Sequence, residues 1–152
     1  MARLNSRLEA EGAEFLVLGQ LLIEGVPTFK TYTRNPDYDL VATNPENNKS
    51  ARIQVKSRWA TDYDGGFLIS RFDFDFLVFV ELNRGYRYAR KASVENGKKS
   101  PSYYVFTPDL AKAALYEKSS WGKALLNRIP NVEHHREAWH LIKEYLADPL
   151  EN

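Results

Sequence analysis

Apolar residues recur at helical spacing near the start of the chain. The segment 6–24 predicts a helix, because Ser6 and Glu9 form a capping box at its start and Gly25 is a good stop signal. The stripe that we expect to pack against a sheet consists of Leu8, Phe15, Leu18 and Leu22. Glu14 lies beside this stripe, near the boundary of the expected buried face.

Short runs of β-forming residues follow this helix. The run 26–33 predicts a first strand and 34–38 a turn, while the apolar run 39–43 and the alternating run 51–57 predict two further strands. A polar turn separates these two runs, so we expect them to pair as a hairpin. The run 76–82 is almost entirely apolar, which is typical of an interior strand covered on both faces.

The second half of the chain continues with strands and helices. Residues 103–107 predict another strand, after which Thr107 and Pro108 have the N-cap and first-turn chemistry of a helix start. A last helix is expected after Asn131. No convincing long helix lies between 58 and 75, so a crossover there is expected to be short or irregular. The pattern predicts an α/β fold, with a central mixed β-sheet flanked by α-helices.

Composition narrows the possible functions. The 152 residues are 43% hydrophobic and 27% charged, which suits a single soluble domain spanning 1–152. With 21 Lys and Arg against 20 Asp and Glu, the formal net charge is +1, so nucleic-acid binding would require local basic patches. The chain has no cysteine, which excludes disulfides, Cys-ligated metals and thiol catalysis. No stretch is apolar enough to cross a membrane and the N-terminal sequence is charged, so a cytoplasmic location is expected.

The segment 84–100 is the most basic part of the chain. Its candidate nucleic-acid-binding residues are Arg84, Arg87, Arg90, Lys91, Lys98 and Lys99, against the single acid Glu95. Tyr86 and Tyr88 interleave with them and could stack on bases, while the cations track phosphates. A solvated loop without a ligand has the same composition, and both interpretations remain open at this point.

Polar residues with catalytic chemistry converge in the expected hairpin. In the strand 51–57, alternation places Ile53 and Val55 on one face and Gln54 and Lys56 on the other. The preceding strand begins at Asp39, so a short hairpin would bring a carboxylate, a carboxamide and an ammonium group together. An ordinary half-exposed edge strand has the same pattern without any catalytic role.

This arrangement resembles the PD-(D/E)XK nuclease superfamily, which has the restriction endonuclease-like fold. The residues that carry the resemblance are 36–42 (PDYDLVA) and 53–57 (IQVKS). Upstream, Gly12-Ala13-Glu14 resembles the helix that supplies an extra acidic metal ligand in many members, notably the archaeal Holliday-junction resolvases. The resemblance covers about residues 12–82, and a Holliday-junction-resolvase-like or homing-endonuclease-like member is expected.

Two positions depart from the family pattern. The literal Pro-Asp is Pro36-Asp37, but Asp39 directly precedes the strand that would project it into the site, so Asp39 is preferred and Asp37 is the reserve. Gln54 stands where the family usually has Asp or Glu, and an amide oxygen is a poorer ligand for a hard cation than a carboxylate. Glu14 could restore the second negative charge.

The resemblance implies a Mg²⁺-dependent DNA endonuclease, with Mn²⁺ as a possible substitute. The implied catalytic residues are Asp39, Gln54, Lys56 and Glu14, and the implied metal ligands are Asp39, Glu14, Gln54 and the carbonyl of Val55. Lys56 would position the attacking water or stabilise the transition state. Because cutting two DNA strands calls for two sites, a homodimer or higher homo-oligomer is expected. The alternatives are a catalytically inactive DNA-binding or interaction module on the same fold, and an unrelated α/β protein. The target, the number of metal ions and a role in restriction, repair, junction resolution or homing stay open.

Overall fold

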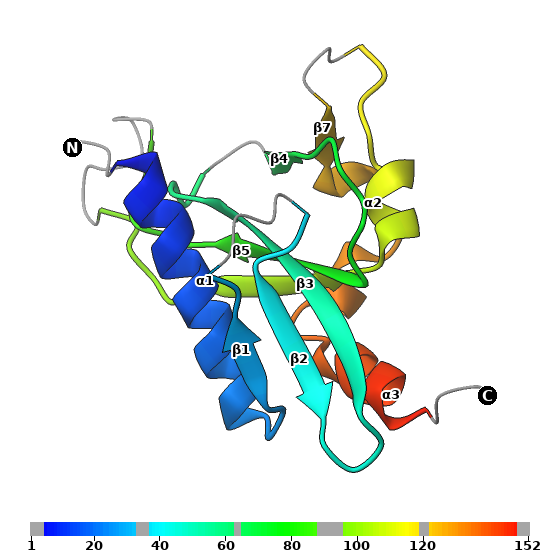
Figure 1. The fold of residues 1–152 in the computed structure, drawn as a ribbon. Helices are drawn as coiled ribbons and strands as arrows, with labels where there is room; N and C mark the ends of the chain where they lie inside the picture. Colours follow the sequence, from blue (N-terminus) through cyan, green and yellow to red (C-terminus); the bar gives the residue numbers. More distant parts are fainter. Residues whose placement is uncertain (1–4, 33–36, 63–64, 88–95, 119–121, 149–152) are drawn as a thin grey trace.

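A five-stranded mixed sheet in the order β1-β2-β3-β5-β6 forms the centre of the fold (Figure 1). The computed structural model describes residues 5–32, 37–62, 65–87, 96–118 and 122–148. The strands are β1 (Thr28–Lys30), β2 (Leu40–Asn44), β3 (Lys49–Arg58), β4 (Gly66–Leu68), β5 (Phe76–Glu81), β6 (Ser102–Phe106) and β7 (Lys123–Leu125). The helices are α1 (Ser6–Ile23), α2 (Pro108–Ala113) and α3 (Trp139–Ala147), with 3₁₀ turns at Leu126–Arg128 and Val132–His135. The expected α/β class with a mixed sheet and flanking helices is confirmed.

The expected hairpin and interior strand are also confirmed. β2 and β3 pair antiparallel, with Leu40 opposite Ile53, while β3 and β5 run parallel, with Gln54 opposite Leu77. β6 pairs antiparallel with the other side of β5, so β5 has a neighbour on each side. Its first five residues are buried, as expected for a strand covered on both faces.

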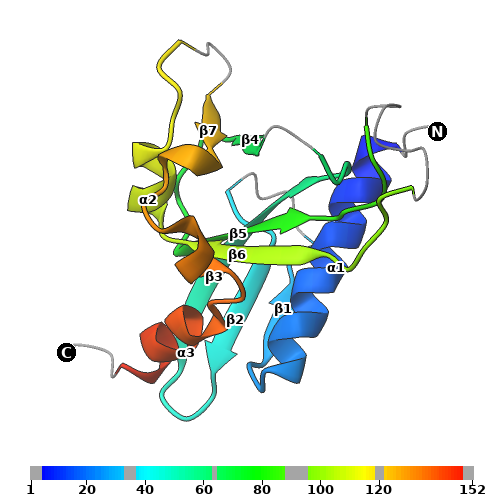
Figure 2. The same cartoon turned by 180° about the vertical axis from the view of Figure 1, so that it is seen from behind.

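The two faces of the sheet have separate cores. α1 and α3 pack against one cluster, which includes Val17, Ile53, Val78 and Ile142. The other cluster lies under the β4–β7 ribbon and α2, and its largest fully buried side chains are Phe67, Phe79 and Phe106. Figures 1 and 2 show β4, β7 and α2 next to one another. Alternation along β3 therefore assigns Ile53 and Val55 to the first core and leaves Gln54 and Lys56 on the second face.

α1 differs from the sequence prediction in its cap and in its buried face. The side chain of Asn5 accepts a hydrogen bond from the N–H of Arg7, so Asn5 is the N-cap and the capping box expected at Ser6 is wrong. The residues buried against the sheet are Ala13, Val17, Leu21 and the polar Glu9. Leu8, Phe15 and Leu22 of the expected stripe face solvent, and Leu18 is only partly buried. The helix has two apolar stripes on opposite sides, and periodicity alone does not tell which one packs on the sheet.

The crossover and the last helix also differ in detail. Between β3 and β5 the described residues form no helix, in keeping with the lack of a helical pattern in this part of the sequence. This segment instead contains β4, which pairs antiparallel with β7, far along the chain. The helix expected after Asn131 begins only at Trp139. Glu137 has a left-handed φ of 49°, which interrupts the helical path between the 3₁₀ turn and α3. Within the described parts of the chain, no helix has the length and apolar character needed to span a bilayer.

Candidate active site

Asp39 directly precedes β2, just beyond the last residue pair of the β2–β3 hairpin. Its N–H donates to the carbonyl of Ile53 over 2.8 Å, and its Oδ2 accepts a hydrogen bond from the N–H of Val55, also 2.8 Å away. The Asp39 carboxylate thus accepts the Val55 N–H of β3 in place of a backbone carbonyl of a neighbouring strand. This contact fixes the carboxylate beside the segment that carries Gln54 and Lys56.

Gln54 and Lys56 line a cavity on the second face of the sheet. The cavity has a volume of about 180 Å³, and its other lining residues are Ile69, Ser70 and Arg71. Gln54 is only 8% exposed, and its Oε1 has no hydrogen-bond partner among the described residues. A buried amide oxygen without a hydrogen-bond partner is costly, and in this cavity it is available as an acceptor or as a ligand to a cation.

Glu14 reaches the same site from α1. Its carboxylate lies within hydrogen-bonding reach of the Asp39 side chain, a bond that forms when one of the two acids is protonated, and it accepts a hydrogen bond from Nζ of Lys30 on β1. Lys30 also pairs with Glu11, 2.7 Å away, and its side chain is only 8% exposed. The ammonium group of Lys30 therefore helps to hold Glu14 in place.

The titration behaviour of the site follows from this crowding. The pKa of Asp39 is raised to about 6: burial is the largest cause and the nearby Glu14 carboxylate adds to it, whereas the Val55 N–H and the charge of Lys56 act in the opposite direction. Burial lowers the pKa of Lys56; Asp39 opposes this and Arg58 adds to it. Two carboxylates that repel each other in a desolvated site become more stable when a cation lies between them.

The donor set fits a hard divalent cation. Glu14 and Asp39 offer carboxylate oxygens, Gln54 offers its unpartnered amide oxygen, and Val55 has a backbone carbonyl. Mg²⁺ binds proteins through one or two carboxylates and keeps several waters, so this set is sufficient. No group of three or more Asp, Glu, His or Cys side chains suited to a metal gathers in the described residues.

Comparison with known proteins gives the fold. No model of a known protein family matches the sequence, and no curated protein does. A solved structure of a bacterial homing endonuclease, I-Ssp6803I, is similar to this chain with a TM-score of 0.59 and 22% sequence identity. The match covers 93% of this chain and 95% of that chain. At this identity the similarity shows that the two proteins share an α/β fold of the kind found in that nuclease.

The structure brings together Glu14, Asp39, Gln54 and Lys56, as the sequence pattern predicted. Their roles as catalytic residues and ligands, like that of the Val55 carbonyl, stay predictions. Asp37 lies nearby but interacts with Arg71, with 3.9 Å between Oδ1 and Nη1.

The basic segment lies at the same end of β3 as the site. The N–H of Arg84 donates to the carbonyl of Trp59, directly after β3, and Arg84 pairs with Lys98 in an isolated bridge. Arg84, Arg87, Lys98 and Lys99 are exposed, while Arg90 and Lys91 lie outside the described residues. The placement fits the expected nucleic-acid-binding role, which remains a prediction.

Sequence reasoning missed Arg71, Ser70 and Lys30. Ser70 and Arg71 follow β4 in a segment without periodicity, so no local pattern indicated that they face Gln54. Lys30 could have been noticed, because its alternation with the exposed Phe29 places it on the side of β1 that faces α1.

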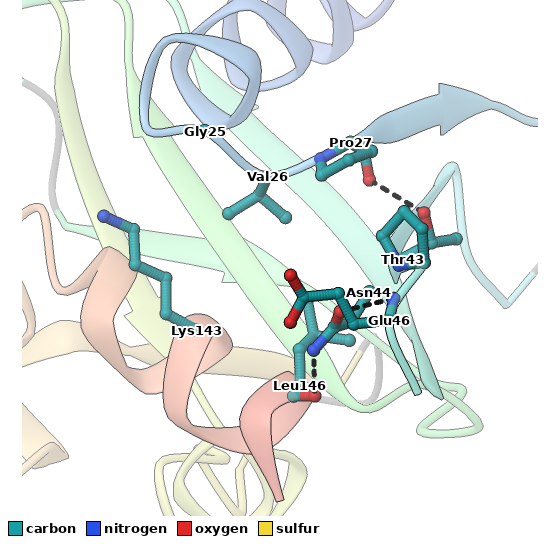
Figure 3. Close-up of a pocket in the computed structure, with 9 residues that line it drawn as sticks. Gly25, Val26, Pro27, Thr43, Asn44, Glu46, Lys143 and Leu146 are labelled. Carbon is teal, nitrogen blue, oxygen red and sulfur yellow. Dashed lines mark hydrogen bonds between the residues drawn. The ribbon is translucent and has the colours of Figure 1, made fainter. Parts of the chain in front are cut away.

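A wider cavity lies at the other end of the hairpin (Figure 3). It has a volume of about 490 Å³ and is bordered by Gly25, Val26, Glu46 and Lys143 among others. Its polar groups already serve the fold: Nδ2 of Asn44 donates to the Leu146 carbonyl, as Figure 3 shows, and Lys143 pairs with Glu24 on the rim. The smaller cavity at Gln54 is therefore the better candidate site, because the buried Oε1 of Gln54 has no hydrogen-bond partner among the described residues.

Proposed function

We propose that this chain is a metal-dependent DNA endonuclease of the PD-(D/E)XK type. The observation that carries the proposal is the buried Gln54 Oε1, which has no partner and lies on the same stretch of β3 that anchors the Asp39 carboxylate. A structural edge strand would leave such an amide exposed or hydrogen-bonded. The similarity to a bacterial homing endonuclease supports DNA as the substrate.

The proposed metal ligands are Glu14, Asp39, Gln54 and the carbonyl of Val55. A bound Mg²⁺ or Mn²⁺ would lower the pKa of a nearby water and neutralise charge that develops on the phosphate. The protein contributes a fixed position for each oxygen: Val55 holds Asp39 and Lys30 holds Glu14. Binding therefore needs little rearrangement of the side chains.

Lys56 supplies the cation of the site. Its ammonium group lies on the same face as Gln54 and lines the same cavity. In this partly desolvated position it orients the attacking water and stabilises negative charge on the scissile phosphate. We assign Arg71 and Ser70, across the cavity from Lys56, to a neighbouring phosphate of the same strand, since Arg71 is 63% exposed and only loosely paired with Asp37.

The exposed residues of the basic segment would extend the phosphate-binding surface. Arg84, Arg87, Lys98 and Lys99 lie at the end of β3 that carries Lys56, so one DNA backbone could contact them and the site together.

The proposal is tested by cleavage of supercoiled plasmid and of branched DNA with Mg²⁺ or Mn²⁺. We expect wild type to cut only with metal, and Asp39→Ala and Lys56→Ala to lose about 100-fold or more in rate. Matched controls are Asp37→Ala, the reserve acid, and Lys49→Ala at the far end of β3, which should stay close to wild type. If folded wild type binds DNA but cuts none of the substrates, the chain is a DNA-binding module on this fold.

A further inference from the structure

The two described ends of the basic segment pair with each other beyond the sheet. Arg84 lies opposite Lys98 in an antiparallel bridge, and the N–H of Tyr86 donates to the carbonyl of Asn96 over 2.8 Å. Figure 2 shows the chain leaving the sheet after β5 and returning to it at β6, on the right of the view. We call these paired ends the basic stem, which consists of residues 84–87 and 96–99.

Thr61, in the segment that follows β3, joins the two strands of the basic stem. Its hydroxyl donates to the carbonyl of Gly97 over 2.7 Å and accepts a hydrogen bond from the N–H of Gly85 over 3.2 Å. Its own N–H donates to the carbonyl of Gly85 over 3.0 Å. In the register set by Arg84 and Lys98, the two glycines lie opposite each other. One hydroxyl therefore connects both strands of the stem at the same level.

Close packing leaves the basic stem little freedom. A Cβ added at Gly97 would lie 2.7 Å from the Tyr86 ring, and the φ of Gly97 is 81°, so only glycine fits at this position. At the base of the stem, Nδ2 of the buried Asn83 donates to the carbonyl of Ser100 over 2.9 Å, and the Asn83 carbonyl accepts the N–H of Lys99 over 3.1 Å. The stem is therefore held at its base and at the level of Thr61.

The basic stem places two cations directly opposite each other. Arg84 and Lys98 are exposed, and opposed residues of an antiparallel pair point to the same side with Cβ atoms about 4.5–5.5 Å apart. Among the described residues neither side chain has an acidic partner. Like charges at this spacing repel each other, and an anion that contacts both of them removes the repulsion. A phosphate group of a nucleic-acid backbone is such an anion.

Thr61 also connects the basic stem to the candidate active site. It lies five residues after Lys56, on the segment that continues from β3. The N–H of Arg84 donates to the carbonyl of Trp59 on the same segment over 2.9 Å, so the stem is attached to it at two points. The position of the stem relative to Lys56 is therefore set before any ligand binds.

We propose that Thr61 is the positioning residue of a phosphate clamp, in which Arg84 and Lys98 together bind one phosphate group of a DNA backbone. The Thr61 hydroxyl holds the two strands of the stem at one spacing, so both cations are in place when the phosphate arrives. Without this hydroxyl the stem has to be ordered during binding, which reduces affinity. The inference rests on the proposed function only for the identity of the anion as DNA.

The first test measures the binding of a labelled DNA duplex by fluorescence anisotropy in EDTA, where no divalent metal supports cleavage. Thr61→Val should weaken binding by about fivefold, because the clamp side chains must then be ordered on binding. Thr61→Ser keeps the hydroxyl and should stay within about twofold of wild type. The control is Thr43→Val, which removes a hydroxyl that donates to the Pro27 carbonyl on β2, and it should bind like wild type. Unchanged binding by folded Thr61→Val, or no binding by wild type, would overturn the proposal.

The second test asks whether Thr61 acts through the two cations, and its first part applies even if Thr61→Val fails to fold. Because the cations share one phosphate, combining Arg84→Gln with Lys98→Gln should lower the slope of log K against log salt concentration by about one rather than about two. Adding Thr61→Val to this double variant should change affinity by less than about twofold. A slope change of about two would overturn the shared phosphate, and a further fivefold loss would overturn the role of Thr61.

The phosphate clamp and the proposed activity can fail separately. If wild type cuts no DNA in Mg²⁺ or Mn²⁺ while Thr61→Val still weakens binding in EDTA, the clamp stands and the nuclease function is wrong. If wild type cleaves DNA, Thr61→Val should raise KM by about fivefold and leave kcat within about twofold of wild type. A loss confined to kcat would place Thr61 in the chemical step and overturn its positioning role.

Discussion

The Asp39 carboxylate accepts a hydrogen bond from the backbone N–H of Val55, with 2.8 Å between the two heavy atoms. Val55 lies between Gln54 and Lys56, so this single contact places an acid next to an amide and an ammonium group. The contact also continues the antiparallel pairing of β2 and β3, whose last backbone pair is Leu40 with Ile53. The site is therefore built into the register of the sheet.

Metal-dependent cleavage should decline in mild acid. Burial raises the pKa of Asp39 from 3.8 to about 6, and only the carboxylate form binds a divalent cation. The cleavage rate at limiting Mg²⁺ should therefore fall as the pH decreases through about 6, and saturating metal should move this limit to lower pH. Cleavage rates measured from pH 5 to 8 at limiting and at saturating Mg²⁺ test this prediction. A rate at limiting Mg²⁺ that stays constant down to pH 5 would contradict a carboxylate ligand with this pKa.

The same pKa predicts how stability depends on pH without metal. An acid whose pKa is raised by folding holds its proton more tightly in the folded state, so its contribution is present below the unfolded pKa and lost as the pH rises through about 6. Wild type should therefore lose stability relative to Asp39→Asn between pH 4 and 7, and Mg²⁺ should restore it. Urea unfolding of both proteins at several pH values tests this, and parallel curves would refute it.

Gln54→Glu should strengthen metal binding and leave cleavage within about tenfold of wild type, because we expect the wild-type site to be active already. Without metal, a third buried carboxylate should lower the melting temperature through repulsion from Asp39 and Glu14. The control is the chain's other glutamine, in Gln20→Glu. If the wild type is inactive and Gln54→Glu cleaves DNA, the natural protein is a silent binding module and the proposed activity is wrong.

Lys30→Met should affect both stability and the pH profile. Burial opposes the charge of Lys30, but its hydrogen bonds with Glu11 and Glu14 raise its pKa and keep it ionised. Losing hydrogen bonds to charged groups costs about 1–3 kcal/mol of stability. The acid limit of cleavage should also move to higher pH, because Glu14 then faces Asp39 without its cation. The control is Lys49→Met; an unchanged acid limit would show that Lys30 does not position Glu14.

Arg71→Ala should weaken DNA binding more than it slows the chemical step. If Arg71 contacts one phosphate, the slope of log K against log salt concentration should decrease in magnitude by about one, whereas kcat should change little. Arg128→Ala, at an exposed position on the 3₁₀ turn after β7, is the matched control. Binding titrations at several salt concentrations provide the measurement, and an unchanged salt slope would remove Arg71 from the site.

The hairpin and the side chains that it brings together could be predicted, because both depend on local rules. Side chains alternate along β3, and a short polar turn brings Asp39 back to Gln54 and Lys56. The buried face of α1 could not be predicted in the same way, since Val17 and Leu22 belong to two stripes with the same periodicity. The sheet, rather than the helix sequence, selects the stripe with the smaller residue Ala13.

Long-range contacts explain the other differences. β4 pairs with β7 more than fifty residues away, so no local pattern in 59–75 could reveal its partner. The late start of α3 depends on Glu137, whose N–H donates to the carbonyl of Tyr103 and whose φ is left-handed. Ser70 and Arg71, which line the cavity, directly follow Ile69 after β4, so their position depends on the same β4–β7 pairing.

The most direct test of the central claim is a calorimetric titration of Mn²⁺ into the protein without DNA, because it does not depend on knowing the target. Wild type should bind Mn²⁺ at least tenfold more tightly than Asp39→Asn, whose fold is checked by its thermal unfolding, while Asp37→Asn should bind like wild type. Equal and weak Mn²⁺ binding by wild type and Asp39→Asn would contradict a metal centre formed by Glu14, Asp39 and Gln54.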